Sequence, residues 1–424
     1  MKPRLFANLD YAALWTGQFV SIFGDRLNSL ALFGLISQET QEFRIAGSSF
    51  ELSKLTIFIL LPAILFGPFI GVLVDRWNTK RVLMSCDLIR AGLVILIPFA
   101  RTLSDSLYPV YGVVFLLYTM NVFFLPARSA ILPELVQKER LLQANSVASF
   151  GAISATILGS ALGGFIVAKA GWRFALYLDS LSFMFSVAAI SFIRYHPAKS
   201  PNLAANGIPS DRRQVRLLAE LRRAALEIVE GWRTIRSNRS VRISILSFIF
   251  PMAGGAALLV GGTALVRKVS GEITQAMGFL LGALGCGAIF GSILMVRYGG
   301  KLTRSHIITG GFVILGISIF LFTFAGSFFQ MTLIVFLMGA AISPIFITSE
   351  TTIQQSVAEG IRGRVFGTRD FSMRTLFLIS AVFVGLSVER IERKDILRFV
   401  GLVLWFLAAA LFVYMKRKRV MQKL

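Results

Sequence analysis

The sequence predicts an all-α membrane protein with twelve transmembrane helices arranged in two six-helix halves. Hydrophobic residues make up 55% of the 424 residues and charged residues only 16%, whereas about 25% of a soluble domain is charged. The apolar residues gather in twelve long stretches, and one long basic segment separates the first six from the last six. Lipid offers the backbone no hydrogen-bond partners, and about 20 apolar residues cross a bilayer as a helix. Each stretch is therefore predicted to be a spanning helix.

The predicted spans follow the apolar stretches along the chain. They cover residues 12–36, 52–74, 82–100, 108–132, 146–168, 172–193, 243–265, 274–296, 305–323, 328–349, 371–389 and 397–415. No cleavage-site pattern follows the first stretch, so we expect it to be a retained helix and not a signal peptide. Within 274–296, Gly278 and Gly282, and then Gly287 and Gly291, form two small-x-x-x-small pairs. Such pairs predict close helix packing.

The charge distribution predicts the orientation of the chain. Its net charge is +22, and the basic residues fall mainly between the apolar stretches. On a soluble protein this charge would suggest nucleic acid, but between membrane spans it indicates cytoplasmic loops and contact with lipid. We therefore expect no nucleic-acid partner, and a multi-pass protein of the inner or plasma membrane with both termini in the cytoplasm.

Residues 194–242 divide the chain. They carry 11 Lys or Arg residues against 4 Asp or Glu residues, and residues 215–236 have the periodicity of an amphipathic helix with a basic face. We expect this segment to be a linker lying on the cytoplasmic surface. The predicted organisation is an N-terminal half at 1–193, the linker at 194–242, a C-terminal half at 243–415 and a basic tail at 416–424.

The residue inventory argues against several kinds of chemistry. There is no G-x-x-x-x-G-K-[ST] phosphate loop, and the glycine-rich stretches lie inside apolar segments. The two histidines, His196 and His306, have no neighbouring ligand clusters, and the cysteines Cys86 and Cys286 imply no disulfide framework. We therefore expect no metal, no cofactor and no enzyme activity.

Ionisable residues inside the spans are the main candidates for function. Asp25 and Arg26 lie near the middle of the first span, where a charge costs about 2.5–3.5 kcal/mol, so such residues usually face a water-filled cavity. Asp25 is the candidate for proton binding or substrate contact, and the alternative is a static Asp25 paired with a basic residue. Gln18 and Ser21 lie one to two turns earlier on a similar face and are candidate cavity-lining groups. Asp179, in the sixth span, is a candidate for a cavity role or for bonding neighbouring helices.

Four further charged residues have plainer interpretations. Asp87 and Arg90 are three positions apart and share one helix face, so a structural ion pair competes with a role in transport. Arg128 and Glu350 lie near the predicted cytoplasmic ends of their spans. For these two we expect snorkelling to the interface or pairing at a gate.

The loop after the second span resembles a known family signature. It reads Gly71-Val-Leu-Val-Asp75-Arg76-Trp-Asn78-Thr-Lys80-Arg81, which resembles the G-x-L-x-D-R-x-G-R-R/K loop of the major facilitator superfamily. The resemblance implies the major facilitator fold and a conformational gate that involves Gly71, Asp75, Arg76, Lys80 and Arg81, with Asp87 and Arg90 nearby. Asn78 replaces the usual glycine. Asparagine tolerates the left-handed conformation better than most residues, so the turn can survive the replacement.

Other motifs narrow the resemblance. Gly24-Asp25, the Pro126–Leu135 segment with Ala144-Asn145-Ser146, and Gly363-Arg364-Val365-Phe366 resemble the macrolide and multidrug efflux branch and the related lysophospholipid transporters. Gly159, Gly163 and Gly164 in the fifth span are similar to the G-P-x-x-G-G motif of drug/proton antiporters. Ser160 replaces the proline of that motif, so the kink that proline would produce is not implied.

These observations support one function and leave two alternatives. We expect a monomeric secondary transporter in contact with membrane lipid that exports amphipathic small molecules in exchange for protons, by alternating access. The first alternative is a lysophospholipid transporter, which need not be coupled to protons. The second is a membrane sensor or scaffold that transports nothing, and the intramembrane Asp25 argues against it.

Overall fold

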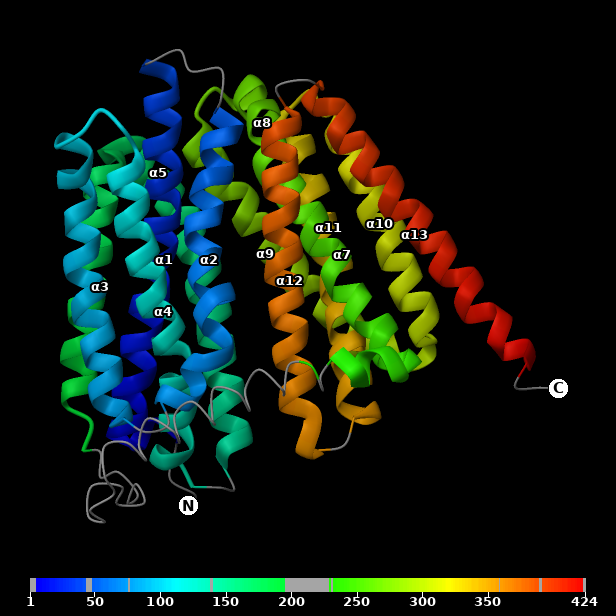
Figure 1. The fold of residues 1–424 in the computed structure, drawn as a ribbon, viewed down its shortest axis with the longest axis horizontal. Helices are drawn as coiled ribbons and strands as arrows, with labels where there is room; N and C mark the ends of the chain where they lie inside the picture. The colour runs from blue at the N-terminus through cyan, green and yellow to red at the C-terminus, as the bar shows by residue number, and fades with distance from the viewer. Residues whose placement is uncertain are drawn as a thin grey trace. The chain divides into compact units, whose positions relative to one another are not determined.

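The computed structural model describes residues 5–42, 48–74, 77–137, 140–194, 229, 232–357, 359–388 and 391–421, and these are helical throughout, with no strand among them (Figure 1). The predicted amphipathic helix at 215–236 lies largely outside the described residues. The long helices are α1 (Leu9–Glu42), α2 (Ser48–Val74), α3 (Thr79–Thr102), α4 (Tyr108–Leu135), α5 (Leu141–Ser191), α7 (Arg239–Gly261), α9 (Ile273–Tyr298), α10 (Arg304–Phe322), α11 (Phe328–Ser356), α12 (Glu359–Ser387) and α13 (Arg393–Met421). Three short elements complete the set, namely α8 (Thr263–Ser270), η1 (Leu5–Ala7) and η3 (Gly299–Lys301).

Helix α5 accounts for two of the predicted membrane crossings. It has 51 residues, which at about 1.5 Å per residue is more than twice the roughly 30 Å thickness of the hydrocarbon layer. Its backbone breaks at Gly171, whose φ of 84° and ψ of 162° are disfavoured for any residue with a side chain. The break falls between the predicted spans 146–168 and 172–193. Among the described residues, 11 helices are long and apolar enough to cross a membrane, and α5 supplies the twelfth crossing.

The helix ends differ from the predicted spans by several residues, as two of the helices illustrate. The span predicted at 243–265 is divided, because α7 ends at Gly261 and the separate α8 begins at Thr263 with the basic residues Arg267 and Lys268 in its last turn. The span predicted at 371–389 begins as a helix at Glu359, well before its apolar part. Helix geometry continues through the polar residues at this end, whereas apolar length alone marks only the part that can lie in hydrocarbon.

The chain forms two compact units. One holds the described residues of Met1–Ala31 and Phe58–Val229, and the other those of Leu32–Ile57 and Glu230–Leu424. Helices α1 and α2 each contribute to both units, since Leu32–Ile57 packs within the second. The candidate residues Asp25, Asp87, Arg90 and Asp179 all lie in the first unit.

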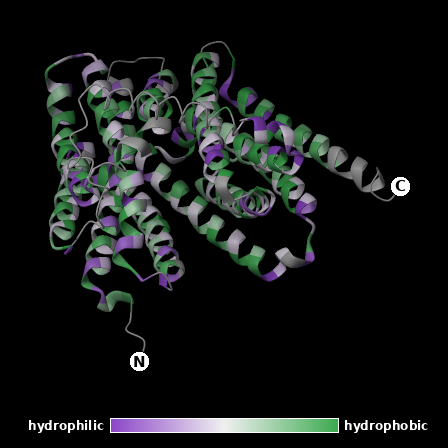
Figure 2. Cartoon of the chain, turned by 60° about the horizontal axis from the view of Figure 1, so that its bottom comes forward, coloured by the Kyte–Doolittle hydropathy of each residue, from purple (hydrophilic) through white to green (hydrophobic). Residues whose placement is uncertain are grey.

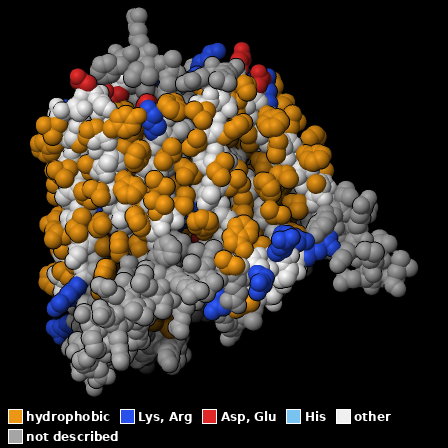
Figure 3. All heavy atoms as spheres, viewed as in Figure 1, with side chains coloured by type: hydrophobic (Ala, Val, Ile, Leu, Met, Phe, Trp, Pro, Cys, Tyr) orange, Lys and Arg blue, Asp and Glu red, His pale blue; other side chains and the backbone are white. Residues whose placement is uncertain are grey.

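The helices expose apolar side chains, as a lipid-facing surface requires. On α3, Leu88, Ile89, Leu96 and Phe99 are 46–54% exposed, whereas Leu83 is fully buried. Figure 2 shows hydrophobic residues along most of the length of the helices, and in Figure 3 hydrophobic side chains cover much of the visible face. So large an apolar surface is unfavourable in water, whereas lipid hydrocarbon solvates it.

Glycines bring α9 and α11 into close contact in the second unit. A Cβ atom on Gly287 or Gly291 would collide with the backbone carbonyls of Phe336 and Ala340, and one on Gly339 would collide with the carbonyl of Leu284. The predicted close packing at Gly287 and Gly291 is thus confirmed.

Candidate functional site

A buried arginine joins α1 to α3 in the first unit. The Arg90 guanidinium donates from Nη2 to Asp25 Oδ1 at 2.6 Å and from Nη1 to Asp87 Oδ1 at 3.0 Å. Arg90 is 2% exposed and Asp87 fully buried, whereas the Asp25 side chain is 30% exposed. The guanidinium carbon also lies 4.0 Å from the ring centroid of Phe183, in cation–π geometry. The structure thus gives Asp25 a basic partner on another helix, and this partner is not the adjacent Arg26.

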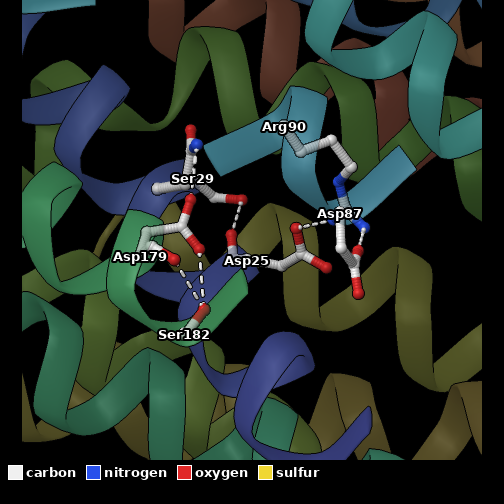
Figure 4. Close-up of polar contacts among 7 residues, drawn as sticks. Asp25, Ser29, Asp87, Arg90, Asp179 and Ser182 are labelled. Carbon is white, nitrogen blue, oxygen red and sulfur yellow. Dashed lines mark hydrogen bonds and ion pairs between the residues drawn. The ribbon is translucent and has the colours of Figure 1, made fainter. Parts of the chain in front are cut away.

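Asp179, on the second half of α5, is held by neutral groups. Asn28 Nδ2 donates to its Oδ2 at 2.8 Å, and Ser182 Oγ lies 3.3 Å from its Oδ1. Asp179 is fully buried, and it forms no ion pair among the described residues. In the view of Figure 4, Asp25 lies between Asp179 with Ser182 on one side and Asp87 with Arg90 on the other.

The acidic groups of this cluster outnumber the basic ones. Asp25, Asp87 and Asp179 could carry three negative charges, whereas Arg90 is the one cation paired with them in the described part of the chain. Arg26 forms no ion pair there, and even if it is counted, one carboxylate remains without a compensating charge. A buried uncompensated charge is strongly unfavourable, and a carboxyl group avoids it by binding a proton. The arrangement can therefore hold at least one exchangeable proton.

Gly24 allows α1 to approach Asp179. A Cβ atom at this position would collide with Ser182 Oγ and Asp179 Oδ1. We expect Gly24→Ala to reduce the free energy of unfolding by about 1–3 kcal/mol, because this close contact must open. The measurement is thermal unfolding of the purified protein in detergent. Gly92→Ala on α3 is the matched control, since nothing lies within 4 Å of its Cβ position. Equal stability of the two variants would contradict this role of Gly24.

The glycines of the antiporter-like motif pack against the other side of α1. A Cβ atom on Gly159 would lie 2.8 Å from the Phe23 carbonyl oxygen, and one on Gly163 would lie 3.0 Å from a Leu27 methyl group. Gly164 is buried as well. Helix α5 thus holds the segment of α1 that carries Asp25 at close range.

The loop signature is only partly described. Asp75 and Arg76 lie outside the described residues, and Gly71 lies in the last turn of α2. Lys80 Nζ donates to the backbone carbonyls of Ser191 and Ile193 at 2.8 Å each, so it caps the C-terminal end of α5. Arg81 is exposed.

Asn78 does not adopt the left-handed conformation. Its φ of −67° and ψ of 110° are extended, and its side-chain oxygen accepts a hydrogen bond from the Arg81 backbone N–H at 3.0 Å. Asn78 is therefore the N-cap of α3, a position where a short polar side chain is preferred for its hydrogen bond.

The remaining candidates are not members of the carboxylate cluster. Gln18 and Arg128 line a cavity of about 260 Å³, whereas Ser21 is buried and is not one of its lining residues. In the second unit, Glu350 accepts a hydrogen bond from Arg369 at 3.0 Å.

Sequence reasoning missed Asn28 and Tyr118. Asn28 lies about one turn after Asp25 on α1. The helical spacing that selected Gln18 and Ser21 before Asp25 would also have selected Asn28, had it been applied to the residues after Asp25. Tyr118 of α4 lies close enough to interact with Asp25, Arg26 and Asp179. In the sequence, Tyr118 is distinguished only by its hydroxyl group within an otherwise apolar span.

Comparison with known proteins identifies the family. Residues 14–377 match the family model of the Major Facilitator Superfamily. The MFS-type transporter YfiS of Bacillus subtilis is 24% identical over 431 residues, covering 95% of this chain and 94% of that protein. Macrolide efflux protein A of Streptococcus pyogenes is 24% identical over 423 residues, covering 96% and 93%.

A solved structure shares the fold. The nucleoside transporter NupG superposes with a TM-score of 0.71 at 14% identity, over 94% of this chain and 100% of that one. The helical architecture and the match along most of the chain lead to one conclusion: this protein is a multi-pass membrane transporter that belongs to the Major Facilitator Superfamily.

Proposed function

We propose that the chain is a proton-coupled exporter of amphipathic small molecules that works by alternating access. The observation that carries the proposal is the buried cluster in which Asp25, Asp87 and Asp179 outnumber their cations. Such a cluster in a transporter is suited to binding a proton in one state and releasing it in another. The similarity to macrolide efflux protein A supports export, and the lipid environment supports an amphipathic substrate.

Asp179 is the proposed proton carrier in place of Asp25. Asp25 already has a cationic partner in Arg90, whereas Asp179 has Asn28 and Ser182 as its side-chain partners among the described residues. The Asn28 amide can serve both protonation states. Its Nδ2 donates to the ionised carboxylate, and its Oδ1, which is buried without a hydrogen-bond partner, could accept from a protonated one after the amide rotates.

Asp25 and Arg90 would link protonation to helix movement. Asp25 is partly exposed, so water can exchange protons with it, and its bond to Arg90 joins α1 to α3. A proton on Asp25 would weaken that bond, and a change of charge on nearby Asp179 would alter how strongly Asp25 holds Arg90. Alternating access requires a structural element with two arrangements, and both the proton and the substrate must be able to shift the balance between them. The Asp25–Arg90 bond between α1 and α3 is proposed as that element.

The proposed orientation places both termini in the cytoplasm of an inner or plasma membrane. In a Cys286→Ser background, which keeps only the buried Cys86, a cysteine at Asp105 should react with an impermeant maleimide from outside intact cells. A cysteine at Ser237 should react only after the cells are opened. The reverse pattern would exclude this orientation.

Transport in proteoliposomes tests the function. In proteoliposomes that hold the transporter inside out, an acidic interior should drive the uptake of amphiphiles. Collapse of this pH gradient by an ionophore should stop the uptake. The panel should include cationic, neutral and anionic amphiphiles together with a lysophospholipid. Lysophospholipid movement that ignores the gradient would favour a lipid transporter, and no transport of any compound would favour a sensor or scaffold.

A further inference from the structure

A cavity in the first unit lies apart from the carboxylate cluster. It has a volume of about 260 Å³ and is lined by residues of α1, α4 and α5. Its polar lining includes Gln18, Arg128 and Asn145, and its aromatic lining is Tyr11, Trp15 and Phe19. The volume is slightly below the range of about 300–1,000 Å³ that holds a whole drug-sized ligand, so the cavity suits one end of an amphiphile.

Two hydrogen-bond donors of this cavity have no acceptor. Arg128 makes no ion pair or hydrogen bond with any described residue, although it lines the cavity near Gln18. Gln18 is 5% exposed, and its Nε2 has no hydrogen-bond partner. No Asp or Glu is among the lining residues. Arg128 is half-buried and Gln18 is buried. A buried donor without an acceptor is unfavourable, and a guanidinium at a cavity wall without a carboxylate beside it is suited to an anionic ligand.

The aromatic wall is held in place by its own hydrogen bonds. Tyr11 Oη donates to the Ala144 carbonyl at 2.9 Å, and Trp15 Nε1 donates to the Val147 carbonyl at 3.1 Å. The rings of Trp15 and Phe19 stack with centroids 5.4 Å apart. Because these polar groups already have partners, the rings offer a fixed apolar surface beside the Arg128 guanidinium.

We propose that this Arg128–Gln18 cavity binds the oxyanion end of an anionic amphiphile, with the guanidinium and the Gln18 amide holding the carboxylate or phosphate and the aromatic wall holding the adjoining apolar body. The inference rests on the proposed export function and names its substrate class as anionic. A guanidinium can bind two oxygens of one oxyanion, which a cationic or neutral amphiphile does not offer. Gln18 precedes Asp25 by two helical turns, about 10 Å along α1. Helix α1 therefore contributes residues both to this cavity and to the carboxylate cluster.

Equilibrium binding tests this inference without any gradient. The probes are 1-naphthaleneacetate, its neutral amide and the matching amine, measured by isothermal titration calorimetry on the purified full chain in nanodiscs. We expect the carboxylate to bind at least about tenfold more tightly than the amide, because a charge-assisted hydrogen bond is lost in the amide. Lysophosphatidate forms a second arm, which distinguishes a lipid phosphate from a soluble carboxylate as the natural source of the anion.

Variants separate the site from general electrostatics. Arg128→Gln should weaken carboxylate binding at least about tenfold and leave amide binding within about twofold, and Gln18→Leu should weaken carboxylate binding less. Arg128→Lys should restore part of the loss. Arg173→Gln, which removes an exposed arginine of the same unit, is the matched control and should change nothing. Thermal unfolding of each variant shows whether it is folded.

Two outcomes would overturn the inference. One is equal binding of carboxylate and amide by the wild type, and the other is unchanged carboxylate binding by a folded Arg128→Gln variant. Neither outcome bears on proton coupling. Conversely, the protein could bind these anions and yet transport no substrate in response to a pH gradient. That result would support the anion site and contradict the proposed function.

Discussion

Asp179→Asn should abolish transport driven by a pH gradient while leaving the protein folded. The asparagine is nearly the same size as the acid and can keep hydrogen bonds to Asn28 and Ser182, but it cannot exchange a proton. We expect the gradient-driven rate to fall by at least about 100-fold, the lower end of the range for loss of a proton-transfer group. Substrate exchange without a gradient should persist, because the amide resembles the protonated acid in shape and neutrality.

The matched control for this variant is Asp395→Asn. Asp395 also accepts a hydrogen bond from a side chain, that of Arg398 at 3.0 Å, but it is 54% exposed and lies in the second unit. It should keep wild-type transport. Asp25→Asn should show an intermediate loss, since it weakens the bond to Arg90 without removing the proposed proton carrier. Wild-type gradient-driven transport by Asp179→Asn would exclude Asp179 as the carrier.

Arg90→Met should be the most destabilising single substitution in the first unit. It removes the one cation that is paired with Asp25 and Asp87 among the described residues, and it leaves the fully buried Asp87 without that cation. Breaking a buried ion pair from one side costs about 3–5 kcal/mol, because the remaining charge is uncompensated. The measurement is the unfolding temperature of the purified protein, together with its yield in the membrane fraction.

An exposed pair of the same spacing provides the control. Arg398 and Asp395 are also three residues apart and 3.0 Å from each other, but they are 34% and 54% exposed. Arg398→Met should therefore cost less than about 1 kcal/mol. The double substitution Arg90→Met with Asp87→Asn should recover much of the stability lost in Arg90→Met. A double variant no more stable than the single one would show that packing of the arginine, and not its charge, dominates.

Much of the fold could be predicted from the sequence, because lipid imposes simple rules on a spanning chain. Apolar length found the spans, and it separated the two crossings of α5, whose backbone breaks between them at Gly171. The same rules failed at Glu359, since apolar length does not report how far a helix continues into polar surroundings. The division at Gly261 was missed for a related reason, because the apolar residues continue through the break between α7 and α8.

The site was harder to predict because its contacts join distant parts of the chain. Spacing placed Asp87 and Arg90 on one face of α3, but nothing in the sequence indicated that Asp25, 65 positions earlier, accepts from the same guanidinium. The same limit hid the bond between Asn28 and Asp179, which spans 151 positions. Such pairings depend on how the helices pack against one another. Gly24 permits the close contact with Asp179, but its role can be recognised only when the neighbouring helix is known.

The most direct test of the proton-binding cluster is infrared difference spectroscopy of the purified protein. A protonated carboxylic acid in an apolar site has a C=O stretching band that an ionised carboxylate lacks. The wild type, titrated from neutral to alkaline pH, should lose such a band. Asp179→Asn should not show it anywhere in that pH range, whereas Asp395→Asn should keep it. A band that persists unchanged in Asp179→Asn, or a wild type with no protonated carboxyl at neutral pH, would contradict the claim that this buried acid carries the transported proton.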